Sequence, residues 1–317
     1  MAAEAPHPLF GAARAALCVG IGGGGDVVGA LAVACAAEAA GLRARVGGVT
    51  WERRPIDPIP GARRAGEVTG AEPIAPGALL AGPDTRGPGG FRFAESHMAG
   101  VLGEPVLLLD PNPGPAGVAR ALDAAATSLG CDLVVLVDVG GDVLAHGPEP
   151  GLASPLCDAV LLAASAHMTV PALGAVFGVG CDGELTPDEV MARLADVAAA
   201  GGWRGAWGLT PADLERLDAA VAAVPTEASA SALRCARGEL GRVPIRGGRR
   251  SVPLSPAGAL TFFFDPAAAL RSAARLAAVV LDAPSMDDAE ERLAALGIRT
   301  ELAYEREALD AAAAAPG

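Results

Sequence analysis

The 317 residues carry 24 basic and 37 acidic side chains, which gives the chain a net charge of −13. Every basic residue is an arginine, so chemistry that requires a lysine, such as a P-loop or a Schiff base, is excluded. The overall acidity argues against general binding to nucleic acid, which needs a basic surface. No apolar run reaches the roughly 20 residues needed to span a bilayer, so we expect no membrane partner.

The composition also indicates a genomic origin and a compartment. Abundant alanine, glycine, arginine and proline, with no lysine or glutamine, is typical of a very GC-rich genome such as that of an actinobacterium. The N-terminus has no charged region followed by a long apolar stretch, so we expect a cytoplasmic protein without a secretory signal. The six cysteines lack Cys-x-x-Cys spacing and are expected to be reduced thiols in the core.

The first 50 residues predict a parallel crossover unit. Residues 16–20 are typical of a buried strand, and four consecutive glycines at 22–25 interrupt it. The pattern over residues 26–40 predicts a helix, and residues 44–49 predict a second strand. A strand, a glycine turn, a helix and another strand form a parallel unit of about the length that such a unit needs.

Residues 52–104 are rich in proline, glycine and arginine and show little periodicity, so we expect a long irregular segment there. Alternating strands and helices follow. The predicted strands are 106–109, 133–137, 172–179, 260–264 and 299–302. The predicted helices are 116–129, three that begin at Pro155, Pro187 and Pro211, and 226–237, 266–281 and 285–296.

This alternation predicts an α/β fold with a doubly wound, mainly parallel sheet of the Rossmann-like type, covered by helices on both faces. We expect residues 1–200 to form the ligand-binding core. Residues 201–317 are expected to form a mainly helical C-terminal part that packs on the core or completes it.

The glycine run Gly22, Gly23, Gly24 and Gly25 is the clearest candidate for ligand binding. Successive glycines let backbone amides turn toward one point, and the following helix adds free amides and a partial positive charge. This arrangement favours a phosphate. The alternative is that the glycines only allow the strand and the helix to pack closely.

Two kinds of nucleotide fit the loop. The spacing Gly20-x-Gly22-x-x-Gly25 matches a dinucleotide fingerprint, and Glu52 lies where an acidic residue would bind ribose hydroxyls. The loop also resembles the Ser-Gly-Gly-x-Asp-Ser loop of ATP-pyrophosphatases, although both serines are absent. We therefore consider ATP and NAD(P) as ligands, with the neighbouring Arg53 as a further ligand contact.

Asp26, directly after the glycines, would repel a bare phosphate. Three roles remain open for it: capping the helix, holding a divalent cation, or binding a hydroxyl or amine of the ligand. A second acidic turn, Asp138-Val139-Gly140-Gly141-Asp142, ends the strand at 133–137. If this strand neighbours the first, Asp26, Asp138 and Asp142 would face one cleft and suit Mg²⁺ or acid–base catalysis.

The glycines Gly140 and Gly141 and the nearby Glu149 and Ser154 are further candidate ligand contacts around this turn. The alternative is an ordinary loop, because aspartate and glycine are common turn residues. A third acidic strand end, Asp182-Gly183-Glu184, is interpreted as a turn because Thr186 begins a helix beside it. Glu95 lies in the long irregular segment, where it could close over the site.

Six segments together resemble an uncharacterised family of archaeal and bacterial proteins, domain of unknown function 1152. The likeness covers nearly the full length of the chain, and it implies no activity. The segments are 22–30 (GGGGDVVGA), 48–60 (GVTWERRPIDPIP), 137–144 (VDVGGDVL), 152–158 (LASPLCD), 260–266 (LTFFFDP) and 297–305 (GIRTELAYE).

The sequence thus favours an enzyme that binds a nucleotide or another phosphorylated or anionic small metabolite, in bacterial specialised metabolism. Its partner would be a small molecule and its cofactor Mg²⁺, and self-association into a homo-oligomer stays open. The alternative function is a non-catalytic protein that senses a ligand or binds a partner through the same loop.

Overall fold

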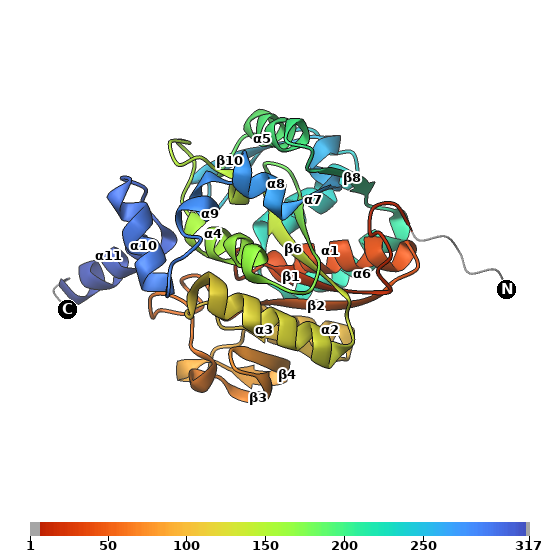
Figure 1. The fold of residues 1–317 in the computed structure, drawn as a ribbon. Coiled ribbons are helices and arrows are strands. Elements are labelled where there is room, and N and C mark those ends of the chain that lie inside the picture. The colour runs from red at the N-terminus through yellow and green to blue at the C-terminus, as the bar shows by residue number, and fades with distance from the viewer. Residues whose placement is uncertain (1–6, 315–317) are drawn as a thin grey trace.

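The computed structural model describes residues 7–314, so residues 1–6 and 315–317, the outer ends of the two predicted regions, lie outside the described residues. The described chain has an α/β fold built on one large mixed sheet (Figure 1). The strands are β1 (Ala15–Gly20), β2 (Arg43–Val49), β3 (Thr69–Ala75), β4 (Ala78–Arg86), β5 (Val106–Leu109), β6 (Leu133–Val139), β7 (Ala172–Phe177), β8 (Trp203–Gly208), β9 (Gly241–Ile245), β10 (Arg250–Leu254) and β11 (Leu260–Phe264).

The helices pack around this sheet, and the threonines predicted to start two of them do cap their first turns. No helix in the described part is long and apolar enough to cross a membrane. The helices are α1 (Asp26–Ala39), α2 (Ala94–Leu102), α3 (Gly114–Leu129), α4 (Pro155–Ala164), α5 (Pro187–Ala199), α6 (Pro211–Ala223), α7 (Glu227–Ala236), α8 (Pro266–Arg271), α9 (Arg275–Val279), α10 (Met286–Ala295) and α11 (Glu301–Ala314).

Nine strands form the large sheet in the order β3-β4-β5-β2-β1-β6-β7-β11-β8, and β9 and β10 form a separate hairpin. The five central strands, from β5 to β7, are parallel. The chain moves from β1 through β2 to β5 on one side, and through β6 to β7 on the other. The winding direction therefore reverses between β1 and β6, which is the point where open α/β sheets generally bind their ligands.

Helices cover both faces of the sheet. Leu17 and Val19 of β1 belong to one apolar cluster with residues of α3 and α4. Ala16 and Cys18 belong to a second cluster with α1, α6 and α7. Because successive side chains of a strand point to opposite faces, the two clusters lie on opposite sides of the sheet. All six cysteines are free and buried, as predicted.

The prediction that residues 52–104 are irregular is wrong. This segment contains α2 and the antiparallel pair β3 and β4, which extend the sheet beyond β5. Its many prolines and glycines concealed the strands. An edge strand such as β3 tolerates Pro73, because one side of it has no neighbouring strand that needs its amides.

The C-terminal part differs from the prediction in several places, and β8, β9 and β10 lie where no strand was predicted. Residues 299–302 do not form a strand, because α11 begins at Glu301 and the Thr300 hydroxyl accepts a hydrogen bond from the Ala303 amide. The helix predicted at 266–281 is divided into α8 and α9. Strands β11 and β8 pair antiparallel beyond β7, so the sheet continues past residue 200.

Candidate functional site

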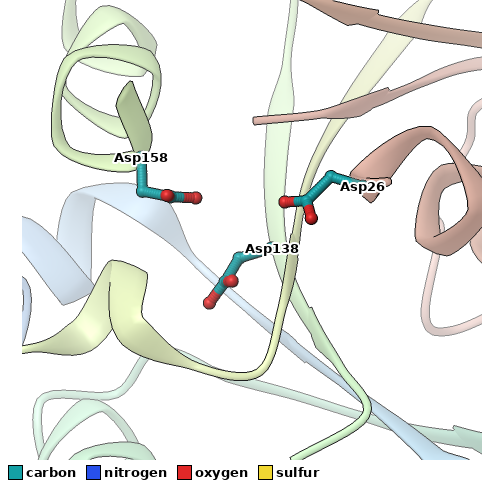
Figure 2. Close-up of side chains that lie close together, drawn as sticks. All are labelled: Asp26, Asp138 and Asp158. Atoms are coloured by element: carbon teal, nitrogen blue, oxygen red, sulfur yellow. The ribbon is translucent and has the colours of Figure 1, made fainter. Parts of the chain in front are cut away.

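Three aspartates from different elements converge at the carboxyl edge of the central strands. Asp26 begins α1, Asp138 lies near the end of β6, and Asp158 lies in the first turn of α4. The three side chains lie close together, with the carboxylates of Asp26 and Asp158 pointing toward one another (Figure 2), and one oxygen of each of the three lies within 4.8 Å of the others. Asp138 and Asp158 are buried and Asp26 is half-buried. We call these residues the first trio.

A second trio consists of Asp142, Asp182 and Glu184, whose carboxylate oxygens also lie within 4.8 Å of one another. All three side chains are buried. Asp142 begins the short turn after β6, and the other two lie in the loop after β7. The structure thus brings together Asp26 and Asp138, as the sequence predicted from neighbouring strands, but it places Asp142 in this second group.

Burial makes ionisation of these carboxyl groups costly. Desolvation raises the pKa of Asp138, Asp142 and Asp158 well above the ordinary value, and negative neighbours in the two trios raise each of them further. Burial also raises the pKa of Asp26 to about 7 and that of Asp182 to about 8. Full negative charge at this edge of the sheet therefore requires compensating cations.

Two carboxylate oxygens of the trios lack hydrogen-bond partners. Within the described residues, the Oδ1 atoms of Asp158 and Asp182 are both buried and accept no hydrogen bond. The two side chains are only 2% and 6% exposed, so bulk water does not supply the missing donors. A buried acceptor without a donor costs free energy unless another group, such as a cation, reaches it.

Glu184 is the best compensated member of the trios. It accepts hydrogen bonds from the amides of Ala153 and Ser154 and from the Ser154 hydroxyl at 2.6 Å. The guanidinium groups of Arg246 and Arg250 lie 3.2 and 3.6 Å from its Oε1. Burial opposes ionisation, but the Ser154 hydroxyl and the two arginines outweigh it and hold the pKa of Glu184 below the ordinary value.

The predicted contact residue Ser154 therefore serves Glu184. It stands at the N-cap position of α4, but its side chain accepts no hydrogen bond from that helix. Instead, its hydroxyl and amide tie the start of α4 to the loop after β7. This tie helps to position Asp158, which lies in the same first turn.

The glycine loop binds groups of the protein itself. The Gly22 amide donates to Asp26 Oδ2 at 3.0 Å, and the Gly24 amide donates to the Trp51 carbonyl at 3.0 Å. At Gly23, whose φ is +85°, a Cβ would lie 2.6 Å from that same carbonyl, so close packing requires the glycine. Within the described residues, the amides of Gly23 and Gly25 donate to no protein acceptor.

Glu52 and Arg53 lie beside this loop. Glu52 accepts a hydrogen bond from the Ala94 amide at the start of α2, and burial raises its pKa to about 7. The Arg53 guanidinium donates to the Gly22 carbonyl and stacks 4.7 Å above the Trp51 ring. It also lies 3.6 Å from Glu301, so Arg53 joins the glycine loop to α11.

The glycines after β6 are required by packing. Gly140 has a φ of +127°, and a Cβ there would collide with the Asp182 carboxyl group. Gly141 has a φ of +118°, and a Cβ would lie 2.6 Å from Val190 Cγ2. The missing side chain of Gly140 therefore lets Asp182 reach the turn that carries Asp138 and Asp142.

Glu149 holds its own loop. Its carboxylate accepts the amides of His146 and Gly147 at 2.8 and 2.7 Å, and Arg193 lies 3.3 Å away. Burial opposes its ionisation, but the His146 amide and the other donors lower its pKa. Protein donors therefore account for the burial of the Glu149 carboxylate without a ligand. The Asp158 carboxylate differs, because its buried Oδ1 has no donor in the described chain.

Sequence reasoning assigned no role to Glu301 and placed Glu95 in an irregular segment. Glu301 of α11 accepts the amides of Leu156 and Cys157 at 3.0 and 2.9 Å and so caps α4 beside Asp158. Glu95 belongs to α2, is 1% exposed and has no hydrogen-bond partner for either oxygen within the described chain. The sequence could have indicated Asp158, because it lies in the first turn of a helix that begins with Ser154 and Pro155. No local pattern indicated Glu301.

Comparison with curated proteins finds no match, and comparison with solved structures finds none either. A family model described as protein of unknown function (DUF1152) matches residues 17–309. The matched range contains both trios, the glycine loop and the capping residue Glu301. The chain therefore belongs to the DUF1152 family of proteins of unknown function.

Proposed function

We propose that this protein is a divalent-cation-dependent enzyme that binds a nucleotide or another phosphorylated small metabolite at the first trio. The observation that carries the proposal is the convergence of Asp26, Asp138 and Asp158, with a buried Asp158 oxygen that has no partner in the described chain. Mg²⁺ prefers a few carboxylate oxygens and completes its coordination with water and substrate phosphate. A bound cation would compensate the buried negative charge.

The position in the sheet supports a nucleotide ligand. In chain order the five parallel strands run 3-2-1-4-5 across the sheet, an order that supports a Rossmann-like interpretation, and Asp26 and Asp138 lie next to the two strands, β1 and β6, between which the order reverses. Ligands of such sheets bind in the crevice at this point. Glu52 follows the second of these strands, the place of a ribose-binding carboxylate, and one of its oxygens accepts the Ala94 amide.

The phosphate would be held mainly through the cation. The Gly22 amide already donates its hydrogen bond to Asp26, and the carboxylates of the first trio would repel a bare phosphate. The amides of Gly23 and Gly25, which meet no acceptor in the described chain, and the half-buried Arg53 supply the positive side of the site. The free, buried cysteines fit a cytoplasmic location for such an enzyme.

Thermal unfolding with and without Mg²⁺ or Mn²⁺ tests the proposal, in combination with ATP, NAD(P) and sugar phosphates. We expect the cation alone to raise the midpoint, and one phosphorylated compound to raise it further only when the cation is present. Consumption of that compound, followed by ³¹P NMR, would identify the enzyme. Binding without consumption would assign a sensing role, and no effect of either cation would contradict the site.

A further inference from the structure

The second trio directly adjoins the first. Asp138 lies near the end of β6 and Asp142 begins the short turn that follows, so the two trios meet at this end of the strand. Asp182 lies against Gly140, in the turn between these two aspartates. The six carboxylates therefore form one continuous centre.

The protein compensates only part of the second trio. Arg246 and Arg250 form ion pairs with Glu184, while neither is within ion-pair distance of Asp142 or Asp182 in the described chain. Asp182 Oδ1 is buried, points against the Gly140 turn and accepts no hydrogen bond from a described residue. The buried carboxyl groups of Asp142 and Asp182 therefore have no arginine partner, and Asp182 Oδ1 has no hydrogen-bond donor in the described chain.

We propose that the second trio holds a second divalent cation, bound chiefly by Asp142 and Asp182 and bordered by Glu184. This inference rests on the proposed function, which it deepens by adding a cation next to that of the first trio. Paired cations suit substrates that react at phosphorus, because they compensate charge on both the attacking and the leaving oxygens. The substrate class would then be a phosphate ester or anhydride.

Equilibrium dialysis of the full chain against Mn²⁺, with metal analysis of the protein, tests the second site. We expect two Mn²⁺ ions per chain in the unaltered protein and one in Asp182→Asn. The matched control is Asp188→Asn, which removes an exposed carboxylate six residues away and should keep two ions. Two ions in a folded Asp182→Asn variant would overturn the inference.

A measurement on the unaltered protein avoids any folding defect of the variant. Mn²⁺ has a strong electron paramagnetic resonance signal, and adjacent ions couple magnetically. We expect an isolated-ion spectrum at one equivalent of Mn²⁺ and a coupled spectrum at two equivalents. One tightly bound ion without coupling at higher loading would overturn this inference and leave the proposed function standing. No bound ion at all would overturn both.

Discussion

The two trios of buried carboxylates differ in how the protein compensates their charge. In the first trio, the described chain brings Arg53 to the glycine loop and to Glu301, and no arginine forms an ion pair with Asp26, Asp138 or Asp158. In the second trio, Arg246 and Arg250 both pair with Glu184. The carboxylates of the first trio thus have no ion-pair partner in the described chain, whereas one carboxylate of the second trio, Glu184, has two.

For the two cation sites proposed above, this difference predicts unequal affinities. A cation at the first trio meets carboxylates whose charge no ion pair offsets, whereas at the second trio two arginines repel it and engage one of the ligands. We therefore expect the first trio to bind the tighter cation.

The largest effect is expected for Asp138→Asn, which removes a charged ligand from the first trio. Consumption of the phosphorylated substrate should fall by roughly 10³-fold, because the cation loses a ligand that stabilises charge developing in the reaction. Steady-state kinetics at saturating Mg²⁺ would measure this. Asparagine keeps the oxygen that accepts the Val143 amide at 3.2 Å, so the variant should fold.

The control for this variant is Asp188→Asn, which removes an equal charge from an exposed position and should leave turnover unchanged. Calorimetric titration with Mn²⁺ should in parallel show about 100-fold weaker binding of the tighter ion in Asp138→Asn. A folded Asp138→Asn protein with unaltered turnover would remove the first trio from the reaction and would reverse the order of the two sites.

A large loss of stability is expected for Glu301→Ala, which removes the acceptor of two amides at the start of α4. Hydrogen bonds to a buried charged acceptor, and the amides left without a partner, together correspond to about 2–4 kcal/mol. Chemical denaturation should show this decrease in the free energy of unfolding. Glu307→Ala on the same helix removes an exposed ion pair with Arg299 and should change stability by less than about 0.5 kcal/mol.

If Glu301→Ala were as stable as Glu307→Ala, the position of Asp158 would not depend on α11. The variant should also weaken binding of the tighter Mn²⁺ ion, because α4 presents Asp158 to the first trio. The weaker ion should be less affected, since none of the ligands proposed for it lies on α4.

A smaller, pH-dependent effect is expected at Glu52 and Glu95, which lie outside both trios. Burial raises the pKa of Glu52 to about 7, and burial together with the charge of Glu52 raises the pKa of Glu95 well above its ordinary value. The folded state therefore keeps protons that the unfolded state releases above about pH 4.5. The stability that these groups contribute is present below that pH and is lost as the pH rises through their folded-state pKa values, which for Glu52 is about 7.

Glu95→Gln imitates the protonated side chain and should not suffer this loss. In a chelating buffer its free energy of unfolding should match the unaltered protein near pH 5 and exceed it by about 1–3 kcal/mol at pH 8. The exposed Glu72→Gln variant should show no such difference at either pH. A Glu95→Gln protein that is less stable at pH 8 would mean that the charged carboxylate is stabilised by groups other than those described.

The smallest effect is expected for Arg246→Ala, which removes one of the two ion-pair partners of Glu184. The second trio should then bind its Mn²⁺ about tenfold more tightly, because one repulsive charge near it is gone. Arg242→Ala alters the same hairpin through a contact with Ser251 and should not change this affinity. Equal affinities in the two variants would show that arginine does not set the difference between the trios.

Local patterns predicted the centre of the fold well. The apolar runs of β1, β6 and β7 are recognisable because parallel strands are buried on both faces, and the capping threonines identify the starts of α5 and α6. The hairpin of β3 and β4 was missed because its strands contain Pro73 and Pro83. Pro73 is tolerated because β3 is the edge strand, and Pro83 because it lies beyond the residues of β4 that pair with β5; local sequence reveals neither position.

Sequence reasoning could predict only those residues of the candidate site that lie at the ends of strands. Asp26 and Asp138 follow adjacent parallel strands, and that rule brought them together. The loop with Asp182 and Glu184 was read as a turn, although it follows β7, the next strand of the sheet. Nothing local distinguishes a solvated turn from one buried beneath the β9–β10 hairpin, whose arginines reach Glu184.

The positions of the six carboxylates depend on helix α11, which the ribosome synthesises after all of them. Glu301 caps the Cys157 amide across 144 positions of the chain, and Glu305 accepts the Trp51 indole across 254. The ribosome therefore produces the six acidic residues of the two trios well before the helix that holds α4 and the Trp51 segment in place. During co-translational folding the sheet can form early, but the arrangement that would capture cations is finished only after α11 has emerged.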